Sequence, residues 1–356
     1  MDNGRSCQCH LGKVLLGPVR HILVHAGAGR HSIKNEKSYK ELMHQACLAA
    51  FEPGLLLQES LSHALSLLER HPIANAGPIG GNLNLNGHVT LDAGVMDGRG
   101  SFGAIGGVPG IQVSKDDHHV LYEPHQVALA LLNQEKSGEG PLGRIPPMLL
   151  CGSEAFEYAQ SLGLVDVTKS DPIPPNVRER YKRHCSWLQE ENEKNKKQKL
   201  IHNQDDVLQD TVGVVVVDDH GHVLSAVSSA GMSLKTPGRI GEAAIFGAGV
   251  WAQNQSRSCP AFGTSVSGQG EQIIRTGIAR KAFERLGKDD VDVPQEMQAL
   301  LVQDFLKSPL LCGYQDHDVG LILYRSDCEK RNPGELWFGH TTPSFAVVCF
   351  LHFLTI

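Results

Sequence analysis

The segment DTVGVVVVDDHGHVLSAVSSAG, residues 210–231, decides the fold. It contains two apolar runs around an Asp-Asp-His-Gly turn, a pattern typical of a hairpin of buried strands. The residues before it, 170–209, hold few apolar side chains and a dense run of charges, which favours a linker that is disordered or loosely helical. Such a long polar linker is unusual inside a compact domain. We therefore interpret the junction between Asp210 and Thr211 as a processing site.

Cleavage before Thr211 would place a hydroxyl and an α-amine on one residue at the start of a strand. A threonine hydroxyl is a weak nucleophile, but an α-amine with a pKa of about 7.7 to 8.0 in model peptides can accept its proton near neutral pH. Before cleavage the same hydroxyl could attack the carbonyl of Asp210 and give an ester that water resolves. The alternative is that Thr211 is only a β-branched residue that opens a strand.

Towards the N-terminus, residues 21–26 are expected to form a buried strand that ends at a glycine-rich loop. Ser38 and Glu41 have the spacing of a capping box, which predicts the start of a helix. A second helix with apolar residues on one face follows and ends before Pro72. The Gly- and Asn-rich stretch 75–110 is expected to form short strands joined by tight turns.

Towards the C-terminus, the pattern predicts a helix over about 271–286 and another near 295–307. Strands are expected at 319–326 and in a long segment that ends at 345–351. The mixture of strands and helices predicts an α/β (α+β) fold.

Composition narrows the class of protein. The 356 residues are 41% hydrophobic, enough for a sizeable core, and the net charge of -6 argues against a nucleic-acid-binding protein. No apolar stretch approaches the roughly 20 residues of a membrane span. The nine cysteines include no CxxC pair, so reduced thiols are expected. Cys7, Cys9 and His10 could hold a soft metal, but no second cluster completes that site, and we expect no cofactor or metal.

The junction segment resembles the processing site of the type 2 asparaginase family of N-terminal nucleophile hydrolases. Within that family the chain is most similar to the threonine aspartases, or taspases, through HAGAG in place of HGGAG, the paired serines, GRIPP at 143–147 and HTT at 340–342. The resemblance extends in family order over VHAGAG at 24–29, NAG at 75–77, LDAGVMDG at 91–98, SSAGM at 228–232, KTPGRIGE at 235–242, GAGVWAQN at 247–254 and SGQGE at 267–271.

The resemblance implies a four-layer αββα sandwich, in which two stacked sheets lie between helices. It divides the chain into an α chain of residues 1–210 and a β chain of residues 211–356, which together form one composite domain. The two chains are expected to pair as a heterodimer and could pair again as a tetramer.

The resemblance makes Thr211 the nucleophile and its free amine the base, and it leaves Asp210 as the last residue of the α chain. Ser229 matches the position where asparaginases have a second threonine that hydrogen-bonds the nucleophile. Ser267 and Gly268 match the pair that lines the oxyanion hole, and a helix that starts beyond them would add positive potential. An ordinary helix-entry turn is the alternative for these two residues.

Arg239 matches the family residue that grips a substrate carboxylate, for which a guanidinium is suited because it can bind bidentately. In a taspase it would receive the side chain of the aspartate that precedes the cut. Glu242 stands where asparaginases have an aspartate that binds the substrate α-amine. The loss of that aspartate fits a peptide substrate, although a glutamate could still reach an amine or have no role. Asn75 is a supporting residue beside the site, or a plain turn asparagine.

The function implied is that of a self-processing threonine endopeptidase that cleaves protein substrates after aspartate. The alternatives are an L-asparaginase or isoaspartyl peptidase acting on small substrates, and an uncleaved scaffold that binds partners through its linker. Basic clusters at 178–183 and 194–199 have the spacing of a two-part nuclear import signal, or form a solvated helical face of mixed charge. Resemblance to taspases, which process nuclear regulators, favours a nuclear pool beside a cytoplasmic one.

Overall fold

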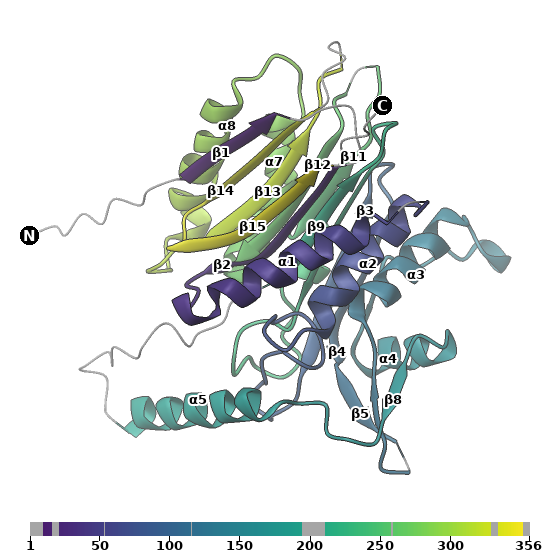
Figure 1. Cartoon of the computed structure of the whole chain (residues 1–356), viewed down its shortest axis with the longest axis vertical. Coiled ribbons are helices and arrows are strands. Elements are labelled where there is room, and N and C mark those ends of the chain that lie inside the picture. Colours follow the sequence, from purple (N-terminus) through teal and green to yellow (C-terminus); the bar gives the residue numbers. More distant parts are fainter. Residues whose placement is uncertain are drawn as a thin grey trace, which may run out of the picture.

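The fold is a four-layer αββα sandwich. Two large sheets face each other, and helices cover the outer face of each (Figure 1). The computed structural model describes residues 10–15, 21–52, 54–114, 116–193, 211–257, 259–328 and 334–351. The fold class expected from the sequence is confirmed.

The larger sheet has seven strands in the order β15-β2-β9-β10-β3-β4-β7, antiparallel apart from the β4–β7 pair. Its strands are β2 (His21–Gly29), β3 (Thr90–Asp97), β4 (Phe102–Pro109), β7 (Leu149–Cys151), β9 (Val212–Val217), β10 (Val223–Ser229) and β15 (Ser344–Leu351). β9 and β10 are the predicted hairpin, and all of their residues are buried. One face of this hairpin is covered by helices and the other by the second sheet, which explains its unbroken apolar runs.

The second sheet has five strands in the order β1-β14-β13-β12-β11, and a small third sheet has the order β5-β6-β8. Their strands are β1 (His10–Leu15), β5 (Ile111–Val113), β6 (His119–Leu121), β8 (Asp166–Thr168), β11 (Val250–Gln253), β12 (Phe262–Gly268), β13 (Val319–Arg325) and β14 (Glu335–His340). The two large sheets are held together by a buried apolar cluster that includes Leu23, Val215 and Ile322.

Helices on the two outer faces bury their apolar sides in two further clusters. The seven-stranded sheet is covered by α1 (Glu36–Ala50), α2 (Leu57–Arg70), α3 (Pro124–Lys136) and α4 (Gly152–Ser161). The five-stranded sheet is covered by α6 (Gly270–Thr276), α7 (Ile278–Leu286), α8 (Val293–Ala299) and the π-helix η5 (Leu300–Leu306). Short 3-10 turns are η1 (Ile33–Asn35), η2 (Pro141–Gly143), η4 (Glu242–Ala244) and η6 (Pro309–Leu311).

Three local expectations differ from the structure. β2 continues to Gly29, because β15 pairs with it along that length. α1 begins at Glu36, two residues before the predicted capping box, and its cap residue Asn35 makes no side-chain hydrogen bond. The single helix expected over 271–286 is two helices, because Gly277 takes a left-handed conformation with φ of 59° that ends α6.

Part of the expected linker is an ordered helix, α5 (Pro175–Glu193). Val177 is buried, Arg180 Nη2 donates to Gly80 O over 3.3 Å, and His184 Nδ1 lies 2.7 Å from Ser233 Oγ. The helical alternative therefore holds for 175–193, whereas residues 194–210, which include Asp210 and the second basic cluster, lie outside the described residues.

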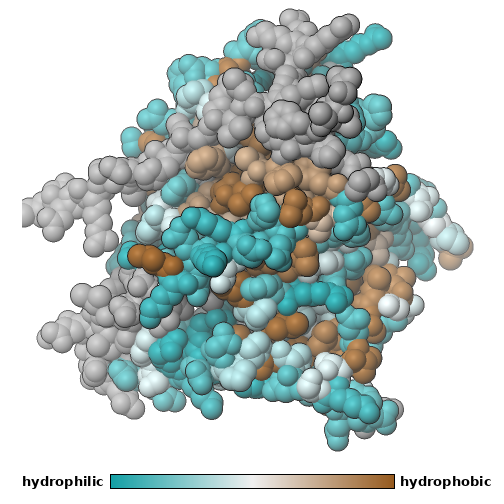
Figure 2. Space-filling view, in the orientation of Figure 1, coloured by the Kyte–Doolittle hydropathy of each residue, from teal (hydrophilic) through white to brown (hydrophobic). Residues whose placement is uncertain are grey.

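The surface has one conspicuous apolar area on the face shown in Figure 2. It lies next to α1, where the half-buried edge strand β15 runs, and polar residues cover most of the rest of that face. None of the helices in the described part of the chain combines the length and the apolar character needed to cross a bilayer.

Candidate active site

Thr211, the first described residue after the linker, lies directly before β9 and lines a small pocket. The pocket is built from the loop after α2, the end of β10, the loop that leads into η4, and the β12–α6 junction. The residues that line it are Asn75, Thr211, Ser229, Gly231, Met232, Arg239, Glu242, Gly268, Gln269 and Gly270.

The hydroxyl of Thr211 has two polar neighbours. The β9–β10 register pairs Val212 with Ser228, so Thr211 lies beside Ser229 at the end of the hairpin. Thr211 Oγ1 is 3.0 Å from Ser229 Oγ and 3.1 Å from Glu242 Oε1. Ser229 Oγ also accepts a hydrogen bond of 3.0 Å from the backbone N–H of Gly231, which fixes the serine hydroxyl.

Arg239 lies between two glutamates. Its Nε and Nη2 each donate to the carboxylate of Glu271 over 2.7 Å, a bidentate pair. Its charge also acts on Glu242: burial raises the pKa of Glu242, and the attraction of Arg239 offsets part of that rise. A Cβ on Gly270 would lie 2.5 Å from both Arg239 Nη2 and Glu242 Oε2, so a larger residue there would displace these two side chains.

A second buried ion pair lies behind the pocket. Lys235 Nζ is 3.6 Å from Asp92 Oδ2 and donates to Thr90 O over 3.0 Å, and the Lys235 and Asp92 side chains have no solvent exposure. Asp92 also accepts hydrogen bonds from the backbone N–H groups of Gly107 and Gly241. Desolvation by burial lowers the pKa of Lys235, an effect that Asp92 opposes. This pair anchors the loop that carries Arg239 and Glu242.

The two residues of the predicted oxyanion hole are placed differently. Gly268 lines the pocket with φ of 139°, and a Cβ there would lie 2.3 Å from Asp318 O, so the position requires glycine. Ser267 is fully buried, and its hydroxyl accepts a hydrogen bond of 3.0 Å from the backbone N–H of Ala28. The Ser267 side chain is thus directed at β2 and is not among the groups that line the pocket.

Asn75 ties the loop after α2 to the end of β10. Its Nδ2 donates to Gly231 O over 2.8 Å, and its Oδ1 accepts from the N–H of Asn82 over 2.7 Å. The backbone N–H of Ala230 donates to Asn75 O over 3.0 Å. These bonds hold Ser229 and Gly231 at the edge of the pocket.

A histidine lies beneath the nucleophile but is a poor base. His25 on β2 pairs with Gly213 and is fully buried, with Nε2 2.9 Å from Ser265 Oγ. Burial lowers its pKa to about 3, and an interaction with the Thr211 backbone offsets only part of that shift. His25 is therefore neutral near pH 7 and too weakly basic to hold the Thr211 proton.

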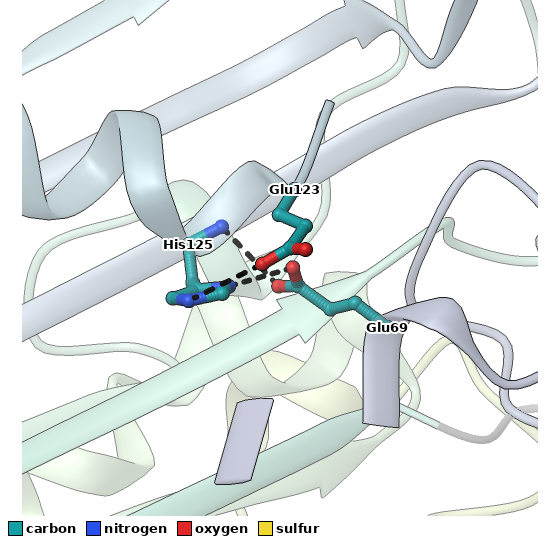
Figure 3. A group of neighbouring side chains, drawn as sticks. All are labelled: Glu69, Glu123 and His125. Atoms are coloured by element: carbon teal, nitrogen blue, oxygen red, sulfur yellow. Dashed lines mark hydrogen bonds and ion pairs between the residues drawn. The ribbon is translucent and has the colours of Figure 1, made fainter. Parts of the chain in front are cut away.

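One group of side chains within the described ranges has metal-ligand types close together: Glu69, Glu123 and His125 (Figure 3). Its ligand atoms are already engaged. His125 Nδ1 lies 2.7 Å from Glu69 Oε2, and Ser62 Oγ lies 2.9 Å from His125 Nε2. Glu123 accepts hydrogen bonds from Ser66 and Arg70. The arginine already supplies the positive charge, so the group is a hydrogen-bonded network that joins α2 to α3. The Cys7–Cys9–His10 side chains lie outside the described residues.

Most of the residues predicted from the sequence therefore meet in one pocket. The structure brings together Asn75, Thr211, Ser229, Arg239, Glu242 and Gly268. It directs the Ser267 side chain elsewhere, and Asp210 is not among the described residues. Sequence reasoning did not single out Asp92, Lys235 or Glu271, the charged residues that hold Arg239 and its loop. A signal was present, since each lies inside one of the glycine-rich motifs that carry the family resemblance.

Comparisons with known proteins identify the family of this chain. A family model described as asparaginase matches residues 18–313. The chain is 30% identical over 298 residues to an isoaspartyl peptidase/L-asparaginase of Mus musculus, which covers 81% of this chain and 78% of the relative. It is 29% identical over 279 residues to a plant-type L-asparaginase of Pyrococcus abyssi, covering 75% of this chain and 80% of the relative. The chain belongs to the type 2 asparaginase family of N-terminal nucleophile hydrolases.

Proposed function

We propose that this chain is a taspase, a self-processing threonine endopeptidase that cleaves protein substrates after aspartate. The observation that carries the proposal is the contact of the Thr211 hydroxyl with Ser229 and Glu242 in a pocket that Arg239 also lines. A nucleophile and a carboxylate-binding cation in one small pocket fit an acyl substrate that bears a second carboxylate.

In the proposed reaction the chain is first cut between Asp210 and Thr211. The freed α-amine of Thr211 then takes the proton of its own hydroxyl, and Oγ1 attacks the carbonyl carbon of the substrate aspartate. The tetrahedral adduct expels the amine of the residue after the aspartate, which takes the proton from the Thr211 α-ammonium as the C–N bond breaks, and the aspartate is left as an ester on Thr211. Ser229 orients that hydroxyl, and the backbone around Gly268 faces the developing oxyanion. Water hydrolyses the resulting ester and returns Thr211 to its starting state.

Specificity for aspartate would come from Arg239. The substrate side-chain carboxylate would share the guanidinium with Glu271 or exchange with it. Glu242 supports a peptide substrate over a free amino acid, because its side chain reaches Thr211 Oγ1 and takes up space beside the nucleophile.

The runner-up is an L-asparaginase or isoaspartyl peptidase. The names of the relatives favour it, and the buried carboxylate of Glu242 is of the type that would bind a free α-amine. A third candidate is an uncleaved scaffold that binds partners through the linker.

Interleaved strands support a stable αβ heterodimer after cleavage. β2, from residues before the cut, lies between β15 and β9, which come after it, and β3 pairs with β10. Separation of the two chains would break the centre of the sheet. We further propose that two heterodimers can assemble as (αβ)2. Substrates would include nuclear regulatory proteins that carry an aspartate before the cut, and the enzyme would be nuclear, cytoplasmic or both.

Two measurements test the proposed function. Mass spectrometry and denaturing electrophoresis of the purified protein should reveal a chain that begins with Thr211, whereas Thr211→Ala should stay whole at 38.6 kDa. The cleaved protein is then incubated with asparagine, an isoaspartyl dipeptide and a protein segment that contains Asp-Gly. Cutting of the protein segment supports the endopeptidase, and rapid release of ammonia or of a free amino acid supports the small-substrate enzyme. An intact band identical in wild type and Thr211→Ala supports the scaffold.

A further inference from the structure

Self-cleavage needs a proton acceptor that the mature mechanism does not supply. In the uncleaved chain the nitrogen of Thr211 is part of the peptide bond to Asp210, and an amide nitrogen is not basic. The Thr211 hydroxyl must nevertheless lose its proton to become a nucleophile. Another group has to accept that proton in the first reaction of the chain.

The contacts of Thr211 Oγ1 identify candidates for this role. Its side-chain partners in the described structure are Ser229 Oγ at 3.0 Å and Glu242 Oε1 at 3.1 Å. A serine hydroxyl is too weak a base to hold the proton, and His25 is kept neutral and weakly basic by burial. Glu242 is the carboxylate within hydrogen-bond distance of the nucleophilic oxygen.

The donors and acceptors around Thr211 Oγ1 determine which group can accept its proton. Thr211 has a single hydroxyl proton, and an ionised carboxylate can only accept. Thr211 Oγ1 is placed to donate to Ser229 Oγ or to Glu242 Oε1, and of these two acceptors the carboxylate forms the stronger, charge-assisted hydrogen bond. The backbone N–H of Gly231 donates to Ser229 Oγ, so one acceptor position of the serine oxygen is already occupied.

We infer that Glu242 is the general base of the self-cleavage step, an inference that rests on the proposed function. Thr211 Oγ1 forms a bond to the carbonyl carbon of Asp210 while its proton passes to Glu242 Oε1. The tetrahedral adduct expels the Thr211 nitrogen, which takes the proton back from Glu242 as the C–N bond breaks. The product is an ester of Asp210 on the Thr211 side chain with a free α-amine. Water hydrolyses the ester to the Asp210 carboxyl and the Thr211 hydroxyl.

The surroundings of Glu242 suit this role. The residue is 3% exposed, and burial raises its pKa, which makes its carboxylate a stronger proton acceptor than that of an exposed glutamate. The charge of Arg239 favours the ionised form of Glu242, which is the form that accepts a proton, while Asp92 acts in the opposite sense. Lys235, which is paired with Asp92, adds a second positive charge on the same side.

Self-cleavage of the full chain made in a cell-free reaction tests the inference. The loss of the 38.6 kDa precursor is followed over time and across pH. Glu242→Gln keeps the size of the side chain and an oxygen acceptor but removes the base, so its rate should fall by about 100-fold or more. Glu242→Asp retains a carboxylate and should cleave faster than Glu242→Gln. The wild-type rate should decrease at low pH as Glu242 is protonated, and Glu242→Gln should lack that decrease.

Glu69→Gln is the matched control. Glu69 is also a fully buried glutamate whose pKa burial raises, but its carboxylate contacts His125. This variant should cleave at the wild-type rate once folded, which circular dichroism checks for every variant. If the wild type cleaves and folded Glu242→Gln cleaves equally fast, the role of Glu242 is overturned while the proposed function stands. If the wild type stays whole like Thr211→Ala, the proposed function itself fails.

Discussion

Replacement of Arg239 by lysine should separate charge from geometry in substrate recognition. Lysine keeps the positive charge but cannot form the two-pronged contact that Arg239 makes with the Glu271 carboxylate through Nε and Nη2, each at 2.7 Å. If the substrate aspartate binds in the same way, the variant loses at least one charge-assisted hydrogen bond. Such a bond contributes about 1.5 to 3 kcal/mol. Since about 1.4 kcal/mol is a factor of ten, kcat/KM for an Asp substrate should fall by roughly 10- to 100-fold.

The assay compares two peptides that differ only in Asp or Asn before the cut, with enzyme whose extent of self-cleavage has been measured. Arg239→Lys should lower the preference for Asp over Asn, because the Asp carboxylate loses one of two charge-assisted hydrogen bonds and is then held by charge alone. Arg280→Lys is a suitable control, since Arg280 forms an exposed i,i+4 pair with Glu284 on α7 that contributes little. Full kcat/KM and an unchanged Asp preference in Arg239→Lys would refute the assignment of Arg239 as the carboxylate site.

Three further changes test neighbouring groups. Ser229→Ala should lower kcat by about 3- to 10-fold through loss of a neutral hydrogen bond to Thr211. It should also lower the free energy of unfolding, measured with denaturant, by about 1 to 3 kcal/mol, because the buried N–H of Gly231 loses its partner. An unchanged kcat would count against the role of Ser229 in orienting Thr211. Glu242 has a folded-state pKa raised above 4.5, so its contribution to stability is present below that value and is lost as pH rises through the folded-state pKa. The free energy of unfolding of the wild type should therefore fall relative to Glu242→Gln as pH is raised from about 4.5 to neutrality, and a constant difference would show that the pKa is not raised. Glu271→Gln should lower KM for an Asp substrate by about 2- to 5-fold, since a half-exposed ion pair contributes up to about 1 kcal/mol; a higher KM would mean that Glu271 positions Arg239.

The sequence predicts the centre of the fold because local and tertiary preferences agree there. The β9–β10 hairpin is rich in β-branched residues and is buried on both faces, so its apolar runs are visible without any knowledge of neighbours. The strand β12 was not predicted, because its small polar residues obscure the alternation of apolar and polar positions that is typical of a strand. Thr264 donates to Ile322 O, Ser265 donates to Ala226 O, and Ser267 accepts from Ala28. These hydroxyls are satisfied only by strands distant in the chain.

The site residues also divide into those that local motifs reveal and those whose contacts depend on distant segments of the chain. Motif resemblance located Thr211, Ser229 and Arg239, because each stands at a fixed place in a glycine-rich segment. The partnership of Arg239 with Glu271 joins residues 32 positions apart and depends on where α6 begins after β12. The orientation of Ser267 depends on which strand faces it across the sandwich. Periodicity and motif spacing along one sequence contain neither kind of information.

The balance of charge in the pocket indicates how a substrate carboxylate would be accommodated. The pocket and its surroundings already hold three carboxylates and two cations: Asp92, Glu242 and Glu271 with Lys235 and Arg239. An incoming aspartate would add a further negative charge to this group of ions. Burial of that charge is costly unless one carboxylate leaves or is protonated. Asp92 is held by two backbone N–H groups and has no exposure, and Glu242 is enclosed beside Thr211. The Glu271 side chain is 41% exposed and lies in the first turn of α6. It can therefore turn into solvent at little cost in free energy. Glu271 is therefore the partner of Arg239 in the free enzyme, and a substrate carboxylate would replace it. Asp would be selected because its carboxylate exchanges with that of Glu271, so that Arg239 stays paired throughout.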